Sequence, residues 1–146
     1  MKTSLLDVNL LVALLWPAHA HHRAALGWFG RKGRRGWATC PFTEAAFIRL
    51  TSNPAFSRDA VAPRQAAEVL ARNIEGPGHV FWPADVSPCE VLRSPELRLA
   101  GHQQVTDAYL LALARRNGGR LVTLDRSMRL LLTDGDATEL VETVVV

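Results

Sequence analysis

A chain of 146 residues, 48% apolar and 21% charged, has the length and composition of one globular domain with a sizeable core, and we expect a single domain over residues 1–146. Its 17 basic residues exceed the 14 acidic ones by three, and all but two of the basic residues are arginines, which favour planar anions such as phosphate. The two cysteines, Cys40 and Cys89, are too few for a disulfide framework or a cysteine-based metal site, so a reducing compartment is expected.

The N-terminus imitates a secretory signal, because Lys2 precedes an apolar run over residues 10–16 and a small-residue pattern at residues 18–20. Asp7 and Asn9 interrupt the apolar segment, however, and the uninterrupted run is far shorter than the ~20 residues that a bilayer span needs. We therefore predict a cytoplasmic protein without a membrane segment.

Strand and helix patterns alternate along the chain. In the first half, a strand at 3–6 is followed by helices at 9–16 and 19–29, a basic loop, a strand at 37–41 and a helix at 44–51. In the second half, the pattern predicts a helix at 63–75, a strand at 79–83, a helix at 105–117, a strand at 120–124, a short helix at 126–132 and a strand at 139–146. Residues 87–103 are broken by prolines and give no clear prediction. Such alternation predicts an α/β fold, with about five parallel strands in one sheet and helices on both faces.

Four acidic residues are placed at the edge of the predicted sheet where such folds bind ligands, outside the carboxyl ends of the strands. Asp7 directly follows the first strand and Asp125 the fourth, while Glu44 and Asp107 lie at the starts of helices. Each is closely flanked by apolar residues, so together they would form a partly desolvated cluster of like charges that binds protons or cations.

Oxygen ligands without histidine or cysteine select a hard ion, Mg²⁺ or Mn²⁺. Such an ion lowers the pKa of bound water and neutralises a leaving oxygen, which suits hydrolysis of a phosphodiester. We therefore predict that Asp7, Glu44, Asp107 and Asp125 are the metal-binding and catalytic residues. Each acid also has a purely structural explanation, since Asp7 and Asp125 suit N-caps and the other two suit the positive ends of helices. The pattern alone leaves both explanations open.

The same blocks of sequence resemble the PIN-domain family, in particular the VapC toxins of bacterial toxin–antitoxin pairs. The segment LLDVNLLVALLW is similar to the opening of the family, and TEAAFIRLTSNP to its second block, which carries Glu44. The segment VTDAYLLALARRNGGRLVTLD is similar to the third and fourth blocks, with Asp107 and Asp125. The resemblance spans nearly the full chain.

This resemblance implies a PIN-like parallel sheet, a Mg²⁺- or Mn²⁺-dependent endoribonuclease acting on RNA, a homodimer, and a cognate VapB-like antitoxin whose tail covers the active site. It also implies that Asp7 and Asp107 contact the metal directly, with Glu44 and Asp125 completing the pocket or acting through water. Many relatives carry a further acid where this chain has Ser127, so the number of ions, one or two, is left open, as are the RNA cleaved and the identity of the antitoxin.

Two other enzyme or signalling classes also place an acid after the first strand. Haloacid-dehalogenase-like phosphohydrolases need a second aspartate two positions on and a late lysine, but this chain has Asn9 there, and its only lysines are Lys2 and Lys32. Receiver-like phospho-acceptor domains need the late lysine as well. A catalytically silent PIN-like RNA-binding domain is a third alternative, against which the presence of all four acids argues.

The loop over residues 31–35, Arg-Lys-Gly-Arg-Arg, is a candidate phosphate-binding edge, since basic residues near a carboxylate site counter its repulsion of RNA. A charge run in a glycine loop is also explained as solvated surface.

Overall fold

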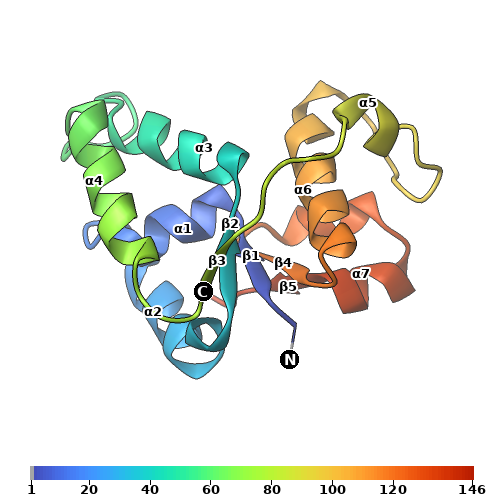
Figure 1. Cartoon of the computed structure of the whole chain (residues 1–146), viewed down its shortest axis with the longest axis horizontal. Helices are drawn as coiled ribbons and strands as arrows, with labels where there is room; N and C mark the ends of the chain where they lie inside the picture. Colours follow the sequence, from blue (N-terminus) through green and yellow to red (C-terminus); the bar gives the residue numbers. More distant parts are fainter. Residues whose placement is uncertain (1) are drawn as a thin grey trace.

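Five short parallel strands form one sheet in the computed structural model, which describes residues 2–146 (Figure 1). Their order across the sheet is β3-β2-β1-β4-β5, so the first strand lies in the centre. The strands are β1 Ser4–Leu6, β2 Trp37–Thr39, β3 His79–Phe81, β4 Arg120–Thr123 and β5 Val141–Thr143. All four pairings are parallel, which confirms the predicted α/β fold.

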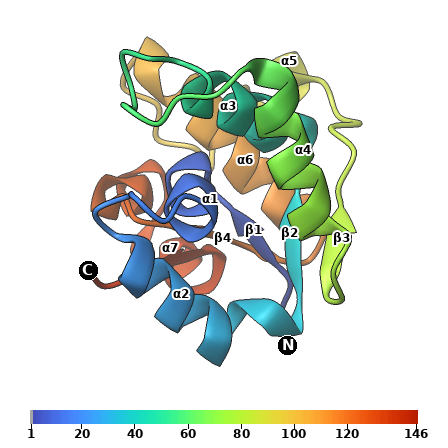
Figure 2. The same cartoon turned by 90° about the vertical axis from the view of Figure 1, so that its left-hand side faces the viewer.

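Helices cover both faces of the sheet, with α1 to α4 on one side and α5 to α7 on the other (Figure 1, Figure 2). The α-helices are α1 Val8–Leu15, α2 His22–Arg31, α3 Pro41–Thr51, α4 Pro63–Ile74, α5 Pro88–Val91, α6 Val105–Arg116 and α7 Asp134–Leu140. Three 3-10 helices, η1 Gly33–Arg35, η2 His102–Gln104 and η3 Arg126–Leu131, lie between them. Within residues 2–146, no helix combines the length and the apolarity that crossing a bilayer requires.

The two faces follow from the alternation of side chains along each strand. Leu5 and Leu121 pack into a core with residues of α6 and α7, whereas Leu6 and Val122 pack into a second core with residues of α1 to α4. Burying each of these side chains contributes about 1.5–3 kcal/mol to folding. Burial on both faces explains why the strands are apolar at consecutive positions.

The register of β1 and β4 places two polar residues side by side at the carboxyl edge of the sheet. Leu6 pairs with Val122, and the backbone N–H of Asp7 donates to the carbonyl of Val122 at 2.9 Å. Asp7 and Thr123 therefore lie side by side where β1 and β4 end.

At the opposite edge, Gly119 allows the start of β4 to approach β1 closely. A Cβ atom at this position would lie 2.5 Å from the carbonyl oxygen of Thr3 and 2.5 Å from the ring of Trp82. Any other residue would therefore force the backbone or the indole to move.

Several element bounds differ from the sequence-based prediction, and helix α7 was not predicted. The predicted strand over 139–146 is wrong in its first part, because Glu139 and Leu140 belong to helix α7 and only Val141–Thr143 is strand. Thr133 caps this helix by accepting a hydrogen bond from the N–H of Asp136 at 3.4 Å. Helix α3 begins at Pro41, which the prediction assigned to a strand, because proline is favoured in the first helical turn.

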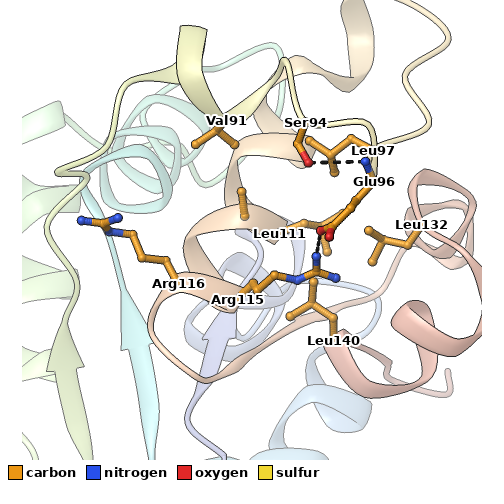
Figure 3. A pocket seen from close by; sticks show the side chains of 10 residues that line it. Val91, Ser94, Glu96, Leu97, Leu111, Arg115, Arg116, Leu132 and Leu140 are labelled. Carbon is orange, nitrogen blue, oxygen red and sulfur yellow. Dashed lines mark hydrogen bonds and ion pairs between the residues drawn. The ribbon is translucent and has the colours of Figure 1, made fainter.

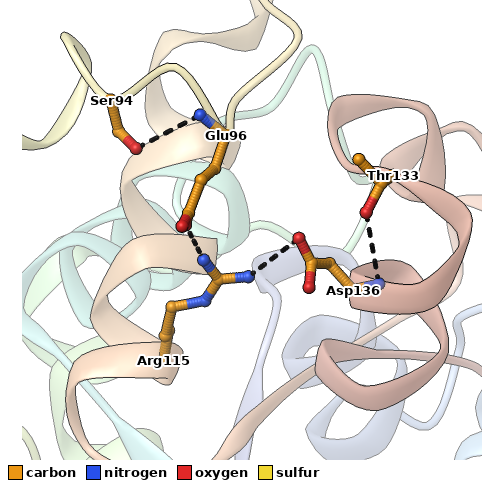
Figure 4. A network of polar contacts seen from close by, with 5 residues as sticks. All are labelled: Ser94, Glu96, Arg115, Thr133 and Asp136. Carbon is orange, nitrogen blue, oxygen red and sulfur yellow. Dashed lines mark hydrogen bonds and ion pairs between the residues drawn. The ribbon is translucent and has the colours of Figure 1, made fainter.

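The segment over residues 87–103, for which the sequence gives no clear prediction, is fastened to the helices beneath it. Arg115 of α6 contacts Glu96 of this segment and lies 3.6 Å from Asp136 of α7 (Figure 4). The N–H of Glu96 also donates to the hydroxyl of Ser94 at 3.4 Å. Exposed ion pairs of this kind contribute only about 0–1 kcal/mol, so the network orients the loop more than it stabilises the fold.

Candidate active site

Asp7 is the most buried of the four predicted acids, with 5% of its surface exposed. As the N-cap of α1 it accepts a hydrogen bond from the N–H of Val8 at 2.8 Å through Oδ1, while Oδ2 accepts one from the hydroxyl of Thr123 at 2.8 Å. Burial raises the pKa of Asp7; the hydrogen bonds from Thr123 and Val8 oppose that rise, and the negative charge of Asp125 adds to it. Asp7 is therefore both the N-cap of α1 and a buried carboxyl group with a raised pKa.

The hydroxyl of Thr123 is the centre of a polar network at the end of β4. Its oxygen accepts hydrogen bonds from the side-chain amide of Asn9 at 3.2 Å and from the N–H of Asp125 at 3.0 Å. Asn9 in turn accepts from the N–H of Leu124 at 3.2 Å. One buried hydroxyl thus joins the ends of β1 and β4, and Thr123 and Asn9 both support the position of Asp7.

Asp107 lies in the first turn of α6 and is half-buried. Burial, followed by the negative charges of Asp7 and Asp125, raises its pKa to about 6. Because both aspartates act on Asp107, the three carboxyl groups are within electrostatic reach of one another. The structure therefore brings Asp7, Asp107 and Asp125 together, although they are distant in the sequence.

Asp125 is the N-cap of η3. Its Oδ1 accepts hydrogen bonds from the backbone N–H of Ser127 at 2.9 Å and from the Ser127 hydroxyl at 2.7 Å. At position 127 this chain therefore supplies a donor that orients Asp125 rather than a further negative charge. The capping explanation predicted for Asp125 is compatible with its nearness to the other two aspartates.

Glu44, in the first turn of α3, has different neighbours. Its Oε2 accepts a hydrogen bond from the hydroxyl of Thr39 at 2.6 Å, and the Nε2 of His79 lies 2.8 Å from the same hydroxyl. Since Thr39 has one hydrogen and donates it to Glu44, the Nε2 of His79 is the donor in the second bond. Burial lowers the pKa of His79, and the negative charge of Glu44 acts in the opposite direction.

Neither Thr39 nor His79 was predicted as part of the site. Both belong to adjacent strands, β2 and β3, and the ring of His79 also packs edge-on against Trp37, with 4.7 Å between ring centroids. No local signal in the sequence distinguishes this histidine, because the pairing of β2 with β3 alone brings it to Thr39.

The donor chemistry of the three aspartates fits a hard divalent ion. They offer oxygen ligands only, and their mutual repulsion is what a bound cation relieves. Within residues 2–146, however, no three His, Cys, Asp or Glu side chains are already arranged as a metal-binding group. Glu44 accepts a hydrogen bond from Thr39, and its negative charge acts on His79. The four-residue metal site therefore stays a prediction.

An apolar hollow of about 330 Å³ lies beside α6. Figure 3 shows its lining, in which Val91, Leu97, Leu111, Leu132 and Leu140 surround the arm of Arg115. None of the four predicted acids lines it. Its chemistry gives no reason to place the reaction there.

Comparison with known proteins identifies the family. The family model described as PIN domain matches residues 4–131 of this chain. The chain belongs to the PIN-domain family. This finding replaces the haloacid-dehalogenase-like and receiver-like alternatives, and it confirms the resemblance inferred from the acidic blocks.

Individual PIN-domain proteins align over nearly the whole chain. Ribonuclease VapC39 of Mycobacterium tuberculosis strain H37Rv is 44% identical over 140 residues, covering 96% of this chain and 98% of the relative. Among solved structures, VapC20 of M. tuberculosis, a Sarcin-Ricin loop cleaving toxin, matches with a TM-score of 0.61 and 16% identity, covering 88% and 94% of the two chains. VapBC2 from Rickettsia felis, bound to a DNA fragment from their promoter, matches with a TM-score of 0.56 and 12% identity over 98% and 99%. These two structures share the PIN-domain fold with this chain.

Proposed function

We propose that this PIN-domain protein is a divalent-metal-dependent endoribonuclease and the toxin of a VapBC-type toxin–antitoxin pair. The observation that carries the proposal is the uncompensated negative charge around Asp107, whose pKa is raised to about 6 by burial and by Asp7 and Asp125. The identity of 44% to a relative named as a ribonuclease supports the reaction and the class of substrate.

In this proposal Asp7 and Asp107 hold the ion, and Asp125 and Glu44 complete the site directly or through water. The ion is Mg²⁺ or Mn²⁺; when bound, it supplies an activated water and neutralises charge on the phosphodiester. Thr123 fixes the carboxylate of Asp7 through the hydrogen bond at 2.8 Å. Ser127 fixes Asp125 in the same manner.

Glu44 is suited to accept the proton of the attacking water. The hydroxyl of Thr39 occupies Oε2 of Glu44. Because the hydrogen bond uses only Oε2, Oε1 can take up a proton while the side chain keeps its orientation. His79 orients Thr39, since its Nε2 donates a hydrogen bond to the same hydroxyl. Glu44 then acts as a base at Oε1, and Thr39 and His79 position it.

The proposal includes one PIN-like domain over residues 1–146, a homodimer, a cytoplasmic location and a VapB-like antitoxin. Both cysteines are free thiols, Cys40 buried and Cys89 exposed, which suits a reducing compartment. The antitoxin is supported by the likeness to VapBC2, and it is tested by the toxicity of the expressed chain and its relief by a co-expressed neighbouring gene product.

The reaction is tested with purified protein and single-stranded RNA, with Mg²⁺ or Mn²⁺ or with EDTA. We expect cleavage only with the ion present, and a loss of about a thousandfold or more in Asp7→Ala and Asp107→Asn, because each removes a charged ligand. The matched control is Asp59→Asn, which changes an exposed aspartate outside the cluster and keeps wild-type activity. Circular dichroism melts show that the variants fold.

Metal-independent cleavage, or full activity in both aspartate variants, contradicts the proposal. Binding of RNA without cleavage under any metal condition identifies the silent PIN-like domain instead.

A further inference from the structure

A polar hollow of about 550 Å³ lies along the outer edge of β5. The side chains of Lys32, Arg120, Arg126 and Arg129 line it, together with Glu142 and Thr143 of the strand itself. We call it the β5-edge pocket. In the part of the chain that the structure describes, β5 pairs only with β4, so no further strand occupies this side. Figure 2 shows the C-terminal end of the chain on the side of the molecule that also carries α2.

The β5-edge pocket has an excess of positive charge. Four cationic side chains face one carboxylate, Glu142, which leaves a net charge of three positive units. Glu142 contacts Lys32 at 3.1 Å and Arg120 at 3.2 Å, and it also accepts a hydrogen bond from the indole N–H of Trp28 at 2.8 Å. One carboxylate therefore serves three donors, and two cations share a single negative charge.

Arg126 and Arg129 are not neutralised by this carboxylate. Both are exposed, and within residues 2–146 neither forms an ion pair. The guanidinium of Arg129 reaches only the hydroxyl of Thr138, at 3.5 Å. These two guanidinium groups are therefore free to bind an anion through bidentate hydrogen bonds, a geometry that suits phosphate and carboxylate.

Three side-chain polar atoms of the pocket residues are buried without a hydrogen-bond partner in the described chain. The Nε of Arg120 and the hydroxyl of Thr143 form no hydrogen bond within the described chain, and both are able to donate. The third buried atom of this kind is Oε1 of Glu142, which faces Arg120 across the ion pair. Unsatisfied buried donors are rare in folded proteins. Both donor atoms are closed to solvent, so a ligand in the pocket reaches them only when the side chain of Arg120 or Thr143 rotates.

Two residues that line the β5-edge pocket, Arg126 and Thr143, adjoin residues of the candidate active site. Arg126 directly follows Asp125 in the chain. Thr143 is the register partner of Thr123, whose hydroxyl binds Asp7. An RNA strand bound at the aspartates therefore needs to extend only past the end of β4 to reach these cations.

We propose that the β5-edge pocket binds a backbone phosphate of the RNA strand next to the bond that is cleaved. This inference rests on the proposed ribonuclease function and assigns the substrate a second contact point. An acidic protein segment would meet the same charges, but the positions of Arg126 next to Asp125 and of Thr143 beside Thr123 favour an RNA strand that reaches both places. The pocket also accounts for one part of the basic loop, since Lys32 faces it while the rest of that loop does not line it.

The test uses a short fluorescein-labelled single-stranded RNA and the full-length protein in EDTA, with fluorescence anisotropy measured over a range of KCl concentrations. For Arg126→Ala/Arg129→Ala we expect about tenfold weaker binding and a salt slope smaller by about 0.7 for each lost phosphate contact. Arg126→Lys/Arg129→Lys keeps the positive charge but loses the planar guanidinium groups. Its affinity for RNA should therefore lie between those of the wild type and the double-alanine variant.

The matched control is Arg64→Ala/Arg72→Ala, which removes the same charge from two exposed positions of α4. It should retain the wild-type salt slope. Because neither Arg126 nor Arg129 forms an ion pair within residues 2–146, their variants should also keep the wild-type melting temperature.

Equal losses of RNA affinity in the two double-alanine variants would overturn the proposed phosphate site, since long-range charge alone would then explain binding. Binding of a glutamate-rich peptide that depends on Arg126, with no such dependence for RNA, would reassign the pocket to a protein partner. Failure of the function has a separate signature: RNA cleaved in EDTA, or not cleaved with Mg²⁺ or Mn²⁺, while the arginine-dependent binding persists.

Discussion

The candidate active site holds its acids in two places, and in both a threonine at the end of a strand donates to a carboxylate. Thr123 of β4 binds Asp7 at 2.8 Å, and Thr39 of β2 binds Glu44 at 2.6 Å. The third partners differ, because Asn9 contacts Thr123 whereas His79 contacts Thr39. A hydroxyl orients a carboxylate without neutralising its charge. The chemical role of each carboxylate therefore depends on its other neighbours.

On the aspartate side, the neighbours are further carboxylates, and the pKa of Asp107 rises to about 6. On the glutamate side, the neighbour is an imidazole that gains a proton at low pH. The difference suggests a division of work in which the aspartates hold the metal ion and Glu44 handles a proton.

The largest difference between the two halves is expected in their contributions to metal affinity. Asp107→Asn should weaken Mn²⁺ binding, followed by isothermal titration calorimetry, by about a hundredfold or more, because it removes charge where repulsion is greatest. Glu44→Gln should weaken it by less than about tenfold while reducing cleavage strongly. Equal losses of affinity in the two variants would show that Glu44 is a metal ligand of the same rank.

A smaller effect is expected from the threonine on the aspartate side. Thr123→Val removes the hydroxyl that Asp7, Asn9 and Asp125 share, at nearly unchanged side-chain volume. It should lower the free energy of unfolding by about 1–3 kcal/mol and Mn²⁺ affinity by about tenfold, because Asp7 loses its orienting donor. Urea denaturation and calorimetry measure the two quantities. Thr138→Val, which changes an exposed threonine of α7, is the matched control.

The smallest expected effect is the pH dependence of stability in the absence of metal. Asp107 has a pKa of about 6 when folded, above its usual 3.8, so the folded state binds this proton more tightly than the unfolded chain does. The free energy of unfolding should therefore fall as the pH rises from about 4 to about 6, on the order of 1–2 kcal/mol for this half-buried group.

In Asp107→Asn most of this fall should disappear; the raised pKa of Asp7 contributes what remains in the same direction. Urea titrations at a series of pH values measure the effect. A wild-type stability that rises over this pH range relative to the variant would contradict the proposed repulsion. Added Mn²⁺ should flatten the wild-type curve, since the ion favours the ionised carboxylates.

Much of the fold could be predicted because its signals are local. Apolar runs, proline and glycine mark most elements in order, and a parallel sheet follows from their alternation. The helix over Asp134–Leu140 was missed because its first turn contains Gly135 between two aspartates, which is typical of a turn. The β-branched run after it then drew the predicted strand too far toward the N-terminus.

The candidate site was predictable in part for the same reason. A carboxylate directly after an apolar strand is visible in the sequence, as at Asp7 and Asp125. The order of the strands is not visible, and it is the placement of β3 beside β2 that brings His79 to Thr39. The pocket along β5 likewise depends on which strand lies at the edge, so the partners of Lys32 could not be inferred.

A substitution at Gly119 would affect the candidate active site from a distance. Gly119 lies at the far end of β4 from the carboxylates, and there a side chain would collide with the backbone of Thr3, the residue before β1. β1 and β4 end beside each other at Asp7 and Thr123, so wedging them apart at one end misaligns the other. In a genetic screen for cells that survive expression of this protein, inactivating substitutions should therefore recur at Gly119, in a protein that still accumulates, as well as among the acids.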